Sequence, residues 1–62
     1  MTLKEKLKFI MENCPELYDE LSAFVPSLIR NPSSASRKDI DRYNYFVLKS
    51  LDEDIAKFLY QL

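Results

Sequence analysis

Three consecutive acids, Asp52-Glu53-Asp54, are the densest group of side chains that could bind a divalent cation. Carboxylate oxygens are the ligands that Ca²⁺ and Mg²⁺ prefer. On a helix, however, consecutive side chains diverge in direction and do not converge on one ion. Acids in the first turn of a helix also stabilise it, because they face the positive end of its dipole. The run therefore predicts the start of a helix, and we predict no metal site in this chain.

Cys14 is the one cysteine of the sequence and its strongest potential nucleophile. A reactive thiol needs a base or a positive neighbour that favours the thiolate, and the chain has no histidine to serve. Cys14 instead continues the apolar pattern of Leu7 and Ile10, which predicts a small buried side chain. A single cysteine also cannot form a disulfide within the chain, so we expect a cytoplasmic protein.

Several basic residues on one predicted helix could contact the phosphates of DNA. They are Arg37, Lys38, Arg42 and Lys49, and a serine-rich turn precedes them. Asp39 and Asp41 lie among them and would repel the nucleic-acid backbone, and the net charge of the chain is −1. A small DNA-binding regulator that uses the helix beginning at Arg37 is therefore the second of two candidate functions, and nucleic acid is not the expected partner.

The residues that are absent exclude whole classes of function. Without histidine, the chain lacks the usual general base at neutral pH and the commonest metal ligand. Without glycine, it cannot form a glycine-rich phosphate loop, and any backbone position with positive φ must be taken by Asn or Asp. We therefore expect no enzyme, no catalytic residue and no cofactor.

Length and hydropathy predict one small domain over residues 1–62. The composition is 47% hydrophobic and 31% charged, which is typical of a globular chain. No run of 18 apolar residues could span a bilayer, and the charged start lacks the core of a signal peptide. Met1 favours a complete reading frame.

Helical spacing of apolar residues predicts helices over about 3–13, 15–30 and 37–61. Thr2 and Glu5 form a capping box before the first, and Ser36 with Asp39 marks the start of the last. Pro26 predicts a kink or break in the second helix near Val25. The fold class is therefore all-α.

The last helix has two interpretations. It either runs unbroken, with Ile40, Val47 and Phe58 on one face, or it breaks at the second capping box, Ser50-Leu51-Asp52-Glu53. In an unbroken helix Asp54 would fall inside the apolar stripe, which favours a break or bend. We predict a compact bundle of three or four helices, the last of them long and bent near Leu51.

Some aromatic side chains lie outside the apolar stripes of their helices. Phe9 points away from Leu3 and Leu7, Phe46 and Tyr60 point opposite to the stripe of the last helix, and Tyr45 lies at its margin. Either a core surrounds these helices on two sides, or the aromatics form a surface that binds another protein.

Of the two candidate functions, the sequence favours a small protein-binding module: an adaptor, regulator or inhibitor that acts through a helical surface. We expect a homodimer, because association is one of the few ways left to stabilise so short a chain without a disulfide or metal. A membrane-surface helix is not expected, because acids balance the basic residues. The interface candidates are Phe9, Tyr45, Phe46 and Tyr60.

Overall fold

The computed structural model describes all 62 residues and contains no strand, and 81% of the chain is helical. The helices are α1 (Leu3–Asn13), α2 (Pro15–Phe24), α3 (Pro26–Arg30), the 3-10 turn η1 (Pro32–Ser34), α4 (Arg37–Ser50) and α5 (Glu53–Leu59). The predicted all-α fold is confirmed. Both predicted bends, near Pro26 and near Leu51, are complete breaks, and the chain therefore forms five α-helices.

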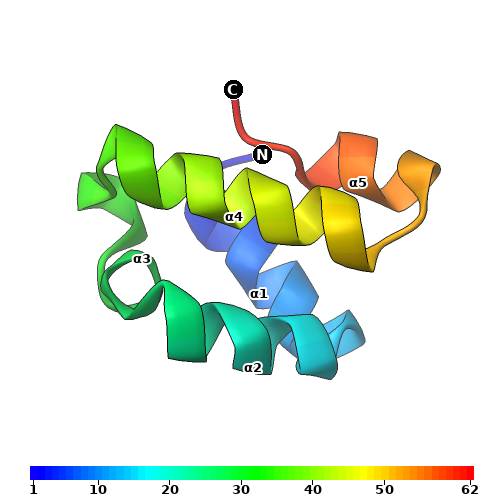
Figure 1. The fold of residues 1–62 in the computed structure, drawn as a ribbon, viewed down its shortest axis with the longest axis horizontal. Coiled ribbons are helices and arrows are strands. Elements are labelled where there is room, and N and C mark those ends of the chain that lie inside the picture. The colour runs from blue at the N-terminus through cyan, green and yellow to red at the C-terminus, as the bar shows by residue number, and fades with distance from the viewer.

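The helices enclose a globule of 26 × 21 × 19 Å (Figure 1). Helix α4 lies across one side of it, and α2 runs alongside α4 in the opposite direction, while α1 packs behind them (Figure 1). Helix α5 folds back after α4 (Figure 1), and the residues that follow it contact α1, where the Lys6 ammonium donates to the Tyr60 carbonyl at 2.9 Å. No helix is both long enough and apolar enough to cross a membrane.

Three of the helix boundaries use the same backbone conformation. Cys14 has φ −135° and ψ 63°, Val25 has φ −135° and ψ 56°, and Asn31 has φ −147° and ψ 77°. Each of the three precedes a proline that begins the next segment. The ring of a proline disfavours helical geometry in the residue before it, while suiting the first position of a new helix. No residue has positive φ, so no turn of the chain requires Asn or Asp in that conformation.

The predicted caps of α1 and α4 are confirmed. Thr2 and Glu5 form the reciprocal capping box, and the Ser36 hydroxyl accepts a hydrogen bond from the Asp39 amide at 3.1 Å. The break after α4 differs in detail, because Ser50 remains helical and Leu51 is extended. The cap of α5 is therefore Asp52, whose carboxylate accepts from the Ile55 amide at 3.1 Å.

The core contains apolar side chains from every α-helix. They are Leu3, Leu7, Ile10, Leu17, Leu21, Val25, Leu28, Tyr43, Val47, Ala56 and Leu59. Phe58, predicted to lie on the apolar stripe of the last helix, is exposed instead, and Met11, Leu48, Ile55 and Leu62 are exposed as well. The break between α4 and α5 explains Ile55 and Phe58, because it turns α5 so that Ala56 and Leu59 face inward.

Candidate functional site

Three aromatic side chains from two helices form a continuous, partly exposed cluster, which we call the aromatic face: Phe24, Tyr45 and Phe46. The rings of Phe24 and Phe46 are stacked, with centroids 5.4 Å apart and planes 16° apart. The ring of Tyr45 meets that of Phe46 edge-on at 5.5 Å. Phe46 is half-buried against the core, whereas Phe24 and Tyr45 are 59% and 60% exposed. The cluster thus packs on the core through Phe46, and its outer surface, formed by Phe24 and Tyr45, is exposed.

The positions of these rings follow from helical spacing. At about 100° per residue, Lys38, Arg42, Tyr45 and Lys49 fall within about 60° of one another on α4. On α2, Glu16, Glu20 and Phe24 fall within about 80° by the same count. The two helices are antiparallel, so the end of α2 brings Phe24 against the third turn of α4. The aromatic face therefore joins a mixed stripe of α4 to a mixed stripe of α2.

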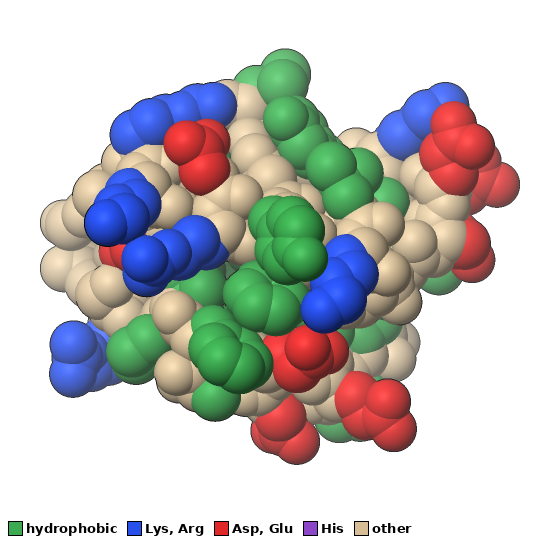
Figure 2. Space-filling view, in the orientation of Figure 1, with side chains coloured by type: hydrophobic (Ala, Val, Ile, Leu, Met, Phe, Trp, Pro, Cys, Tyr) green, Lys and Arg blue, Asp and Glu red, His purple; other side chains and the backbone are tan.

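Lys49 borders the aromatic face. Its ammonium nitrogen lies 5.7 Å from the centre of the Tyr45 ring and 5.8 Å from that of Phe46. These distances are within the range of cation–π attraction, which holds the lysine stem along the rings. In the space-filling view apolar side chains gather in the middle of this side of the molecule (Figure 2).

The two other interface candidates lie elsewhere. Phe9 of α1 is half-buried and meets Phe58 of α5 edge-on at 5.6 Å. Tyr60 is half-buried just after α5, and its carbonyl accepts a hydrogen bond from the Lys6 ammonium at 2.9 Å. Of the four interface candidates, Tyr45 and Phe46 therefore contact each other, whereas Phe9 belongs to a separate ring pair and Tyr60 lies near Lys6.

Phe58 was predicted to lie on the apolar stripe of the last helix, and neither Phe24 nor Phe58 was predicted to be a surface residue. The signal for Phe24 was its spacing from Glu16 and Glu20, which puts it on the charged side of α2. No comparable signal was present for Phe58, because its exposure depends on the direction that α5 takes after the break.

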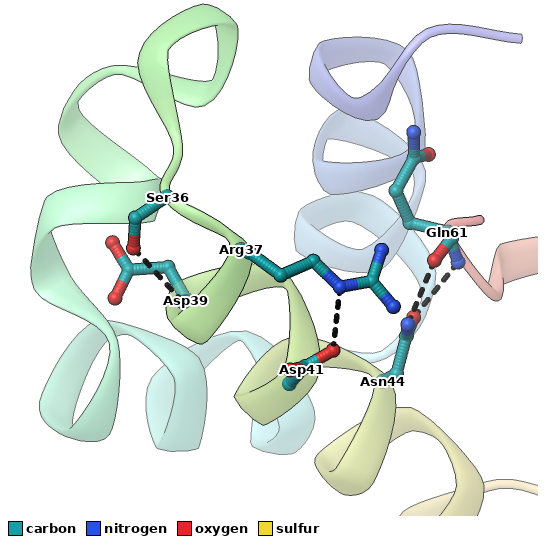
Figure 3. A network of polar contacts seen from close by, with 6 residues as sticks. All are labelled: Ser36, Arg37, Asp39, Asp41, Asn44 and Gln61. Carbon is teal, nitrogen blue, oxygen red and sulfur yellow. Dashed lines mark hydrogen bonds and ion pairs between the residues drawn. The ribbon is translucent and has the colours of Figure 1, made fainter.

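Hydrogen bonds fasten the end of the chain to α4 and α1. The side-chain amide of Asn44 donates to the Gln61 carbonyl at 2.7 Å and accepts from the Gln61 amide at 2.8 Å (Figure 3). The Tyr43 hydroxyl donates to the Leu59 carbonyl at 2.6 Å, and its burial raises the pKa of Tyr43 well above the ordinary value. No buried side-chain polar atom lacks a partner. These contacts are structural.

Asp39 and Asp41, which lie among the basic residues of α4, both form polar contacts within the chain. Arg37 and Asp41 form an ion pair at 3.1 Å (Figure 3). Asp39 accepts a hydrogen bond from the Ser27 hydroxyl at 2.6 Å. Lys38 and Arg42 are exposed and form no ion pair with their own chain. Lys49 of α4 also lacks an ion-pair partner, but it lies against the rings of Tyr45 and Phe46. Lys38 and Arg42 are therefore the two positive charges of α4 that are free of both kinds of contact.

Cys14 and the acidic run have structural roles. Cys14 is half-buried between α1 and α2, beside an open hollow of about 380 Å³ that Glu20 and Leu51 also line. Asp52 caps α5, and Glu53 pairs with Lys57 at 3.6 Å. No group of three or more Cys, Asp or Glu side chains is arranged to hold a metal ion.

Comparison with protein-family models, with curated proteins and with solved structures found no match to this chain.

Proposed function

We propose that this chain is a small cytoplasmic protein-binding module, an adaptor, regulator or inhibitor, and that it binds through the aromatic face. The observation that carries the proposal is the contact of Phe24, Tyr45 and Phe46 across two helices, with two of the three rings about 60% exposed. Aromatic side chains are enriched at the centres of protein interfaces, where each contributes a large apolar area.

The aromatic face suits a binding surface because its rings are already held in place. Phe46 packs against the core, and Phe24 and Tyr45 are each in ring contact with it. Rings ordered before binding lose little conformational entropy when a partner covers them. Covering one large apolar side chain stabilises a complex by about 1.5–3 kcal/mol.

The same proposal assigns no catalytic role to any residue. The chain has no histidine, and neither its thiol nor its carboxylates lie in a cluster that could activate a nucleophile or bind a metal ion. A lone unpaired cysteine is compatible with a reducing compartment.

The test is capture of partners from a lysate of the producing cells by three immobilised forms of the protein. The wild type is compared with Tyr45→Asp, which places a charge on the aromatic face, and with Met11→Asp. Met11 is 48% exposed on α1, outside that face, so the second variant controls for the added charge. We expect the wild type and Met11→Asp to retain the same protein and Tyr45→Asp to lose it. Identical capture by all three forms would contradict the proposal.

DNA binding by α4 is the second candidate, and it rests on Lys38 and Arg42, which have no ion-pair partner. Two free charges give weak, non-specific binding, because the affinity for DNA grows with the number of phosphates neutralised. A gel-shift assay at physiological salt should therefore show no sequence-specific complex. A specific complex at nanomolar protein, abolished by Arg42→Gln, would make this candidate the better one.

A further inference from the structure

Charged side chains flank the aromatic face at its two ends. Lys38 and Arg42 lie in the first two turns of α4, before Tyr45 and Phe46, and form what we call the basic end. Glu16 and Glu20 lie about two turns and one turn before Phe24 on α2 and form what we call the acidic end. Because α2 and α4 are antiparallel, the two groups lie at opposite ends of the face, and Lys49 also lies at the acidic end, where it borders the rings of Tyr45 and Phe46. Figure 2 shows several Lys and Arg side chains on the left and several Asp and Glu side chains at the lower right, with one further Lys or Arg side chain beside these acids at the centre right.

The basic end is not explained by the stability of α4. Positive charges near the N-terminus of a helix are unfavourable, because they face the positive end of its dipole. Lys38 is the second residue of α4, and neither it nor Arg42 has an ion-pair partner within the chain. By contrast, Glu16 lies in the first turn of α2, where an acid is favourable. Lys38 therefore does not stabilise α4, and the charges of Lys38 and Arg42 are both available to a partner.

We propose that the occupant of the aromatic face is a second copy of this chain, bound in a two-fold antiparallel pair. In such a pair one surface meets itself after a half-turn, so the basic end of each copy lies on the acidic end of the other. The rings of the two copies meet at the centre, and both charged contacts form at the rim. Charge complementarity selects this occupant, because a two-fold axis through the rings brings opposite charges together at both ends. This inference rests on the proposed function and names its partner.

The surface of the molecule is large enough for an interface of standard size. A standard interface covers about 800 Å² on each partner, which is about a fifth of the 4204 Å² surface of this chain. Exposed charge pairs contribute little each and are screened by salt. The dimer should therefore dissociate in the micromolar range and weaken by roughly tenfold when the salt concentration rises from about 50 mM to about 500 mM.

The test uses two variants of opposite charge in sedimentation equilibrium. The first, Lys38→Glu with Arg42→Glu, makes both ends of the face acidic, and the second, Glu16→Lys with Glu20→Lys, makes both ends basic. In a dimer of either variant, like charges would meet at both ends of the aromatic face. Each variant should therefore dimerise at least tenfold more weakly than the wild type. In an equimolar mixture opposite charges meet again at both ends, and the affinity should return to within a few-fold of the wild type. Circular dichroism of each variant checks that the helices persist.

Different results separate the two proposals. Wild-type protein that is monomeric at millimolar concentration would overturn the antiparallel pair, while partner capture that depends on Tyr45 would still support the binding module. Dimers of equal strength in the wild type, both variants and their mixture would overturn the charge-paired arrangement. If a variant unfolds, the single changes Arg42→Gln and Glu20→Gln replace it, and both should reduce the salt dependence of dimerisation. Salt dependence unchanged in both would overturn the proposal.

Discussion

Phe46 of α4 stacks on Phe24, the last residue of α2, with ring centroids 5.4 Å apart and planes inclined by 16°. The pair links two helices that lie 13 residues apart in the chain, and it joins the exposed surface to the core through Phe46. The stacking therefore affects both the stability of the fold and the shape of the proposed binding surface.

A double-mutant cycle measures this contact. Phe24→Ala and Phe46→Ala should each lower the free energy of unfolding, and Phe46→Ala should lower it more because its ring is half-buried against the core. The double variant should lose less than the sum of the single losses by about 0.5–1.5 kcal/mol, the usual energy of an aromatic pair. Urea unfolding at a protein concentration well below the dissociation constant of the proposed dimer provides the values. Strictly additive losses would show that the rings do not interact in solution.

The secondary structure could largely be predicted from the sequence, because local chemistry determines it. The capping residues Thr2 and Ser36 and the prolines at positions 15, 26 and 32 set where helices begin and end. These effects operate over a few residues and do not need knowledge of the tertiary fold.

The direction of α5 and the membership of the aromatic face could not be predicted in this way. The direction of α5 depends on contacts of Tyr43 and Asn44 with Leu59 and Gln61, which are 16 and 17 residues away. The pairing of Phe24 with Phe46 likewise depends on how α2 crosses α4. Periodicity within one helix identifies its apolar side, but it contains no information on which neighbour covers the other sides.

The stability of the fold should fall at alkaline pH because of Tyr43. Its phenol is buried and bonded to the Leu59 carbonyl, and burial raises its pKa above the ordinary value of 10.0. A raised pKa means that the folded state holds the proton more tightly than the unfolded chain. The contribution is therefore complete below about pH 10 and is lost progressively as the pH rises above that value.

Urea unfolding of the wild type and Tyr43→Phe over this range isolates the effect. Tyr43→Phe should cost about 1 kcal/mol at neutral pH, the net value of one hydrogen bond. It should also show a smaller loss of stability above pH 10. Equal alkaline slopes in the two proteins would show that the Tyr43 phenol does not cause the decline.

Cys14→Ala should leave partner binding and dimerisation intact and lower the free energy of unfolding by about 1 kcal/mol, as the truncation of a partly buried side chain does. The backbone bonds of Cys14 to Ile10 and Tyr18 do not involve its side chain and should remain. A thiol reagent should modify the native protein more slowly than the urea-unfolded chain, because the thiol is half-buried. Equal rates in the two states would show that the thiol is fully accessible.

Asn44 should be the most sensitive polar residue of the molecule. It is 5% exposed, and its side chain satisfies both the amide and the carbonyl of Gln61. Asn44→Ala leaves both backbone groups without their partner and should cost about 2–3 kcal/mol. Gln61→Ala is the matched control, because it removes only the side-chain contact with Lys6 and keeps both bonds to Asn44. Hydrogen exchange at the residue 61 amide should quicken strongly in Asn44→Ala and little in the control, and equal exchange in both would refute the assigned role of Asn44.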